Sequence, residues 1–314
     1  MASIRDKIVA VGVGGTMATA ALLTTAGAVQ SGAFADRAVA SSEQLTSEVL
    51  DQVTTGAYDV VRTQGELIGQ SVRSQLAVAG ELAGRDGGIR QGGGAVTWKA
   101  VNQLSKAESS VTLPRLMLGE TWFGQNRDLA VNTPLVDQVK TLTGATVTVF
   151  QRMNDQGDML RVATNVPTLE KKRALGTYIP VVGGDGKPSP VLAKVLEGET
   201  FFGTAFVVNA WYDSAYQPIK DATGRVTGVL YVGVQQQSVP SLRASLTGTD
   251  VGANGHVMVL GTSGTRRGTY LVAPEGAKDG DSALDVKDAG GAPWVQQVVE
   301  AAPALKGDTI GQVR

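Results

Sequence analysis

The feature that most constrains this chain is an uncharged stretch from Ile8 to Ala35, close to its N-terminus. About 20 apolar residues in a helix cross the hydrocarbon core of a bilayer. Arg5 and Lys7 stand just before the stretch, and such basic residues stay on the cytoplasmic side. The sequence therefore predicts a transmembrane helix over residues 8–30 of an inner-membrane protein, with everything after about residue 36 extracytoplasmic.

Two other interpretations of this stretch are open. Ala-Phe-Ala at residues 33–35, before Asp36, fits the small-x-small pattern of a signal-peptide cleavage site, although the apolar region would be unusually long. The run that starts at Lys7 also looks like a strand leading into a dinucleotide-binding loop. Met17 occupies the third glycine position of that pattern and no second strand follows, so the membrane anchor is the favoured interpretation.

A long amphipathic helix is predicted to follow the anchor. Its apolar or small residues recur mostly at steps of three or four, and the first proline of the chain is Pro114. They are Leu45, Val49, Val53, Ala57, Val60, Leu67, Val78 and Leu82. Such a stripe packs on the helix's own domain, or pairs with the same helix of a second subunit, and both arrangements can hold along different stretches. Clustered glycine from Gly84 to Gly94 should end the helix.

Beyond Val96 the pattern changes to short apolar runs separated by turns. Residues 146–151 and 159–164 read as two strands of a hairpin, because Asn154–Asp158 supply good turn chemistry. A helical stretch at 191–196 follows, and then three further strands at 201–208, 215–219 and 226–234. The order of strand, strand, helix and three strands is that of a PAS-like sensing domain.

The same theme begins again after a polar connector. Residues 256–260 and 270–274 are predicted strands, residues 293–302 a helix, and residues 307–313 the start of a third strand. A PAS-like sheet needs about five strands to cover its core, so we expect further β sequence after Arg314.

Composition excludes several functional classes. The chain has no Cys, one His and a net charge of −1. A catalytic triad or a His-rich or Cys-rich metal site therefore lacks its residues, and no basic run offers a nucleic-acid surface. We expect no enzyme activity, no cofactor, no metal and no nucleic-acid partner.

Several segments, in order, resemble the Cache 3/Cache 2 fusion domains of methyl-accepting chemotaxis receptors. The resemblance covers roughly residues 40–314, and His256 departs from it by replacing an aromatic residue. Its segments are Leu116–Asn126, Gly144–Phe150, Arg161–Val166 and Tyr212–Gly233. The resemblance implies two stacked PAS-like modules outside the membrane, on a long N-terminal helix, with small organic acids or similar metabolites as ligands.

A ligand site is predicted on the concave side of the first sheet. Arg161 could hold a carboxylate with two parallel hydrogen bonds, and Thr164, Tyr212 and Tyr216 are expected around it. Strand alternation places Arg161, Ala163 and Asn165 on one face. Equally, Arg161 could be an exposed edge-strand charge, in which case Arg127 is the next candidate.

The loop from Val166 to Pro190 should cover this site. Lys171, Lys172 and Arg173 would add positive potential at its mouth. An anionic small molecule is the expected ligand.

The sequence thus predicts an α+β protein with a long N-terminal helix and two PAS-like (Cache) antiparallel modules, the second incomplete. The expected function is the ligand-sensing region of a transmembrane chemoreceptor, acting as a homodimer. Alternatives are the sensor region of a histidine kinase or diguanylate cyclase, or a secreted periplasmic binding protein. The expected segments are a cytoplasmic N-terminus (1–7), the transmembrane helix (8–30), the long helix (31–90), the first module (91–236), a linker (237–249) and the second module (250–314).

Overall fold

The computed structural model describes residues 7–12, 31–184, 186–208, 210–235, 244, 246–249, 251, 255–262, 266–288 and 290–305. The chain divides into two compact units. Glu66–Ser238 form the first unit, and Ala2–Gly65 with Val239–Arg314 form the second. The boundary at residue 65 falls inside a long helix, so each unit includes a part of it.

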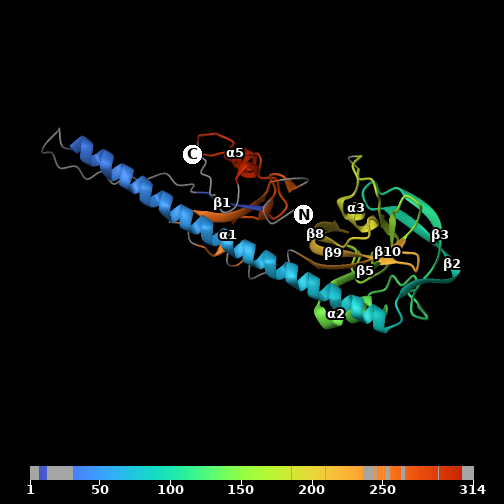
Figure 1. Ribbon diagram of the computed structural model, residues 1–314. Coiled ribbons are helices and arrows are strands. Elements are labelled where there is room, and N and C mark those ends of the chain that lie inside the picture. Colours follow the sequence, from blue (N-terminus) through green and yellow to red (C-terminus); the bar gives the residue numbers. More distant parts are fainter. Residues whose placement is uncertain are drawn as a thin grey trace. The chain divides into compact units, whose positions relative to one another are not determined.

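This long helix, α1, runs without interruption from Ser31 to Arg85, as its apolar periodicity predicted (Figure 1). Two hydrogen bonds close its C-terminal end: Gly88 N donates to Ala83 O at 2.7 Å, and Gly87 N to Gly84 O at 3.2 Å. Gly87 and Gly88 adopt φ values of 95° and 77°. Glycine reaches these angles without a Cβ clash, so the glycine cluster ends the helix where predicted.

The first unit is built on a nine-stranded sheet with the order β4-β3-β2-β7-β6-β5-β10-β9-β8 (Figure 1). All neighbours are antiparallel except β2 and β7. The strands are β2 Ile89–Asn102, β3 Glu108–Leu118, β4 Thr121–Trp122, β5 Thr146–Arg152, β6 Met159–Thr164, β7 Thr177–Ile179, β8 Phe201–Val207, β9 Ala210–Lys220 and β10 Val226–Gln235. The five predicted strands are confirmed as β5, β6, β8, β9 and β10.

The structure adds strands that the sequence reading did not assign. The long β2–β3 hairpin passes through the glycine run at residues 92–94, where the register shifts between Gln91 and Ala95. Gly94 has φ 81°, and such a shift is typical of a β-bulge that glycine permits. The glycine run therefore interrupts the strand pairing locally and does not prevent it.

The two faces of this sheet have different cores. On one face the C-terminal part of α1 and α2 (Val136–Thr143) pack on the sheet through Val72, Leu76, Val136 and Val139. On the other face α3 (Pro190–Leu196) covers a cluster that is rich in aromatic residues. Figure 1 shows α2 and α3 on opposite sides of the central strands. The second face is where the ligand site was predicted.

The second unit contains a three-stranded sheet with the order β1-β11-β12. Strands β11 (His256–Gly261) and β12 (Tyr270–Val272) and helix α5 (Trp294–Ala301) agree with the prediction, and the short 3-10 helix η4 (Ala302–Ala304) extends α5. Met258 and Leu260 of β11 pack in one apolar cluster with α5, while Val257 and Val259 pack in another with α1. The expected third strand at 307–313 lies outside the described residues.

Strand β1 (Lys7–Gly12) differs from the helix expected to begin at residue 8. It pairs antiparallel with β11, from Lys7 opposite Gly261 to Gly12 opposite His256. Ile8, Val9 and Val11 are β-branched, which favours an extended backbone. The rest of the expected transmembrane span, residues 13–30, lies outside the described residues. In the described part of the chain, no helix is long and apolar enough to cross a membrane.

Candidate ligand-binding site

A bulge between β5 and β6 arranges the side chains of the candidate site. Thr148 pairs with Thr164 and Phe150 with Arg161, and the register shifts between these two pairs. Thr148 and Phe150 lie two residues apart on β5 and share a face, so Arg161 and Thr164 share that face too. The expectation that Arg161 shares a face with Ala163 and Asn165 is therefore wrong, because regular alternation fails across the bulge.

Arg161 is fully buried, with 2% of its surface exposed. Its Nη1 donates to Thr177 Oγ1 and, at 3.5 Å, to Ala174 O. Its guanidinium carbon lies 5.1 Å from the centre of the Phe150 ring. Its Nε is buried and has no hydrogen-bond partner, and no carboxylate of the described residues forms an ion pair with it. It is therefore not the exposed edge-strand charge of the alternative interpretation, and it is a buried cation without a described counter-ion.

Three tyrosines extend this face across β10 and β9. Tyr231 pairs with Tyr216 in the strand register, and their ring centres are 4.8 Å apart. Tyr212 lies four residues before Tyr216 on the same face of β9, and both belong to the same apolar cluster as Phe150. The sequence reading named Tyr212 and Tyr216 but missed Tyr231 and Phe150. Their alternation with Val149 and Leu230 is the signal that could have identified them.

The burial of these groups shifts their protonation equilibria. Desolvation lowers the pKa of Arg161, and the nearby Tyr216, Tyr231 and Tyr212 act in the opposite direction. Desolvation also raises the pKa of Tyr212, Tyr216 and Tyr231. All three tyrosines are therefore neutral near pH 7, and their hydroxyl groups can donate hydrogen bonds to an acceptor.

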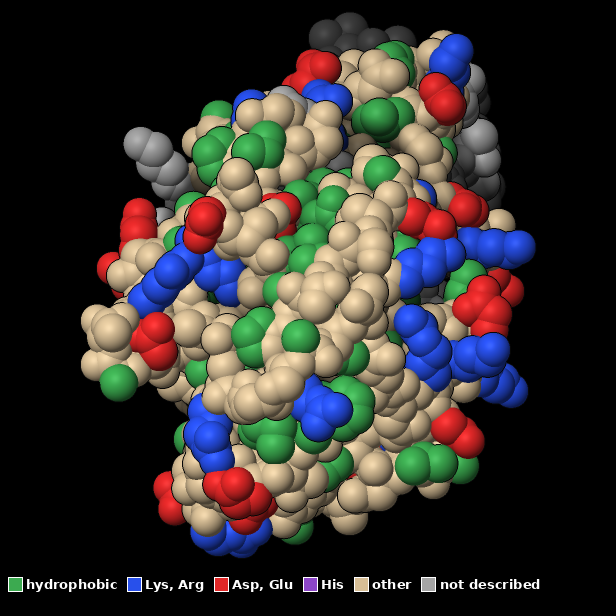
Figure 2. All heavy atoms as spheres, turned by 90° about the vertical axis from the view of Figure 1, so that its right-hand side faces the viewer, with side chains coloured by type: hydrophobic (Ala, Val, Ile, Leu, Met, Phe, Trp, Pro, Cys, Tyr) green, Lys and Arg blue, Asp and Glu red, His purple; other side chains and the backbone are tan. Residues whose placement is uncertain are grey.

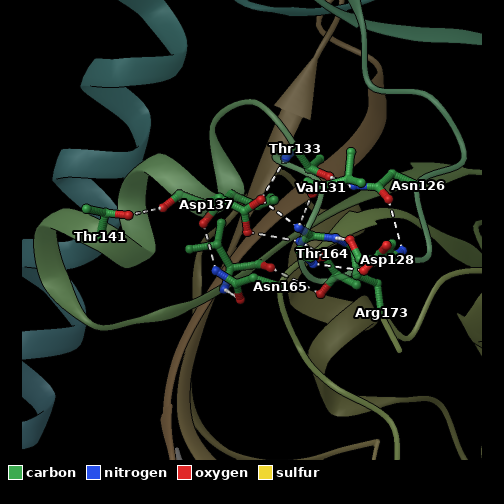
Figure 3. A network of polar contacts seen from close by, with 12 residues as sticks. Asn126, Asp128, Val131, Thr133, Asp137, Thr141, Thr164, Asn165 and Arg173 are labelled. Atoms are coloured by element: carbon green, nitrogen blue, oxygen red, sulfur yellow. Dashed lines mark hydrogen bonds and ion pairs between the residues drawn. The ribbon is translucent and has the colours of Figure 1, made fainter. Parts of the chain in front are cut away.

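The second buried arginine, Arg173, has a different environment (Figure 3). It forms a bidentate ion pair with Asp137, with Nη1 to Oδ1 at 2.9 Å and Nη2 to Oδ2 at 2.6 Å. Its remaining N–H groups donate to the backbone oxygens of Asp128, Val131 and Thr164. All five donors are thus used within the fold. Arg173 was expected at the mouth of the site, but it is a structural residue that ties the loop before α2 to the end of β6.

The two remaining predicted site residues, Thr164 and Arg127, differ in burial. Thr164 is buried on the site face, and its Oγ1 lies 2.6 Å from Thr148 Oγ1 and donates to Val147 O. Arg127 is exposed, and its Nη1 donates to Leu175 O. The structure thus brings Arg161, Thr164, Tyr212 and Tyr216 to one face, while Arg127 lies in an exposed loop.

The covering loop of the prediction contributes to the same core. Val166, Ile179 and Val181 lie in or against the aromatic-rich cluster, together with Leu192 and Val195 of α3. A separate surface hollow of about 490 Å³ lies beside α2 and is lined by Asp86, Pro134, Asp137 and Thr141 among others. Its Asp137 is already paired with Arg173.

One face of the molecular surface carries charged side chains of both signs. Figure 2 shows Lys and Arg side chains interspersed with Asp and Glu over the face that it presents. A mixed distribution of this kind produces no extended field of one sign. The charged surface side chains of this face therefore indicate no preference for an anionic or a cationic ligand.

A predominantly antiparallel sheet that follows a long N-terminal helix is consistent with the class of α+β, PAS-like sensor domains. A family model described as the Cache 3/Cache 2 fusion domain matches residues 36–312. The chain belongs to this family and is an extracytoplasmic sensor region. No curated protein matches the chain. Among solved structures, the periplasmic domain of RsbU from Chlamydia trachomatis aligns with 79% of this chain and 70% of its own, at 13% identity and a TM-score of 0.36.

Proposed function

We propose that this chain is the ligand-sensing region of a bacterial transmembrane chemoreceptor, and that it binds a small organic anion at Arg161. The observation that carries the proposal is the burial of Arg161 without a described carboxylate partner. An unpaired buried ion costs several kcal/mol after relaxation. An anionic ligand would supply the missing counter-ion, and its bond to a desolvated guanidinium would be correspondingly strong.

Strands β8 and β9 offer a route from this site to α1. Tyr216 faces the site and contacts Phe201 of β8 edge to face, with ring centres 6.1 Å apart. The next residue of β8, Phe202, points to the other face, where the guanidinium of Arg73 on α1 lies 3.9 Å from its ring centre. A movement of β8 on ligand binding would therefore reach the helix directly. In the proposed receptor, a cytoplasmic output domain reads the resulting shift of α1.

The exposed surface of α1 supports a homodimer. Apolar residues at helical spacing are exposed there, and the positions between them on the same face, Gln52, Gly56 and Thr63, carry no charge. These exposed apolar residues are Leu45 at 61%, Val49 at 52%, Val60 at 36% and Leu67 at 52%. We propose that this uncharged stripe pairs with the same stripe of a second copy.

The ligand site can be tested by calorimetry on the purified chain in lipid nanodiscs, with a panel of small organic anions. Arg161→Gln should weaken binding at least tenfold, since loss of a buried charge-assisted contact costs on the order of 2–5 kcal/mol. Arg90→Ala is the matched control, because Arg90 is an exposed arginine paired with Glu120. Loss of binding in Arg127→Ala, with full binding in Arg161→Gln, would move the site to the exposed loop.

The assignment to a chemoreceptor needs a cellular measurement. In the receptor that carries this chain, Arg161→Gln should abolish the swimming response to the anion that binds, while Arg90→Ala should retain it. An unchanged swimming response to that anion, with binding lost in vitro, would favour a kinase or cyclase output instead.

A further inference from the structure

The buried polar side chains of the described residues contain two cations and no carboxylate. They are Thr133, Thr148, Gln151, Arg161, Thr164, Asn165, Arg173, Ser214 and Thr262. Arg173 is neutralised by Asp137, which is partly exposed, and it has no donor left for a ligand. Within the described chain, the site face therefore has one uncompensated positive charge, on Arg161.

Some hydroxyl groups on this face form hydrogen bonds with described residues, and others do not. Tyr231 Oη lies 3.5 Å from Thr146 Oγ1, and Thr164 is paired with Thr148. Glycine at position 233 leaves room for the Tyr231 hydroxyl group, because a Cβ atom at this position would lie 2.1 Å from Tyr231 Oη. In contrast, the hydroxyl groups of Tyr212 and Tyr216 form no hydrogen bond with a described residue.

The unused groups that this face presents can all donate a hydrogen bond. They are the Nε of Arg161, which is buried without a partner, and the hydroxyl groups of the neutral Tyr212 and Tyr216. The two hydroxyl groups can also accept, but the buried described residues include no carboxylate. A carboxylate, which only accepts hydrogen bonds, matches this set. A ligand ammonium group needs an acceptor, best a carboxylate, and a second ligand carboxylate needs a second cation. Lys171 and Lys172 on the covering loop are exposed, so their charges are solvated by water.

We infer that the ligand is a small monocarboxylate that has neither a second acidic group nor an ammonium group. This inference rests on the proposed anion site at Arg161 and specifies its ligand class. One guanidinium neutralises one carboxylate, and the surrounding Phe150, Tyr216 and Phe201 provide apolar rings for an uncharged remainder. A dicarboxylate or an α-amino acid of the same length would bury one charge without a partner.

The inference is tested with three matched series of two to six carbons: aliphatic monocarboxylates, dicarboxylates where they exist, and α-amino acids. Calorimetry on the whole chain in nanodiscs should give the tightest binding within the monocarboxylates. The dicarboxylate and the amino acid of equal length should bind at least about tenfold more weakly, a difference of roughly 1.4 kcal/mol.

The possible outcomes distinguish an error in the ligand class from an error in the anion site. Tighter binding of a dicarboxylate or an amino acid that is lost in Arg161→Gln would overturn the ligand class and leave the site intact. Binding of any series that persists in Arg161→Gln, with the circular dichroism spectrum unchanged, would overturn the site. If none of the three series binds the wild-type chain, both are wrong.

Discussion

The two buried arginines allow a paired experiment in which one substitution has opposite effects. Methionine approximates the volume of arginine and has no charge or hydrogen-bond donor. We expect Arg161→Met to stabilise the ligand-free chain and Arg173→Met to destabilise it. Both arginines are almost fully buried, so the difference comes from their partners rather than from burial.

The magnitudes follow from what each substitution leaves behind. Removal of Arg161 relieves the desolvation of an unpaired cation, and Thr177 Oγ1 still donates to Ala174 O at 3.3 Å. Replacing buried ionic groups with well-packed apolar ones is often neutral or stabilising by about 1–4 kcal/mol. The cation–π contact with Phe150 that is lost offsets roughly 1 kcal/mol of this gain. Removal of Arg173 leaves the Asp137 carboxylate without its counter-ion and takes one donor from each of three backbone oxygens, although Val131 O keeps Asn126 Nδ2 and Asp137 Oδ2 keeps Thr133 N. Breaking such a buried ion pair should cost about 3–5 kcal/mol.

Thermal unfolding followed by circular dichroism measures both effects without ligand. At about 2–4 °C per kcal/mol for a unit of this size, Arg161→Met should raise the Tm by several degrees and Arg173→Met should lower it by more. The same Arg161→Met chain should lose the Tm increase that a bound monocarboxylate gives to the wild type. If Arg161→Met lowers the Tm as much as Arg173→Met does, Arg161 is a structural residue and the reasoning for a ligand site is refuted.

Three further predictions concern the tyrosines and α1. Tyr216→Phe should weaken monocarboxylate binding by about three- to tenfold in calorimetry, through loss of one donor, whereas Tyr178→Phe should not. Val49→Glu should dissociate the proposed dimer in analytical ultracentrifugation, whereas Thr55→Glu on the charged side of α1 should not; a dimer in both variants would exclude the stripe. Burial raises the pKa of Tyr231 in the folded state above the value of about 10 that it has in the unfolded chain. The free energy of unfolding that neutral Tyr231 contributes is therefore complete below about pH 10 and is lost as the pH rises above this value. Urea titrations from pH 9 to 11 should therefore show a steeper loss of stability in the wild type than in Tyr231→Phe, and equal slopes would contradict this.

Much of the fold could be predicted because its signals are local. The apolar periodicity and the glycine cluster at residues 84–88 predicted α1 and its end, and alternating residues predicted the β5–β6 hairpin. Ser189 and Pro190 form a helix start that precedes the predicted α3. In contrast, the β2–β3 hairpin contains glycines that were interpreted as a break, and β2 also pairs with β7, which is distant in the sequence.

For the candidate site, too, the sequence predicted the local features and the tertiary structure decided the others. The sequence by itself determined that Arg161 and Tyr216 lie on strands of one sheet, since strand propensity and alternation depend on near neighbours. Only the tertiary structure decided that the bulge turns Arg161 and Thr164 to the same face. Only it decided, too, that Arg173 meets Asp137, 36 residues away, while Arg161 meets no carboxylate of the described chain. The pairing of a buried charge depends on which distant side chains the fold brings within about 4 Å, and no local pattern encodes that distance.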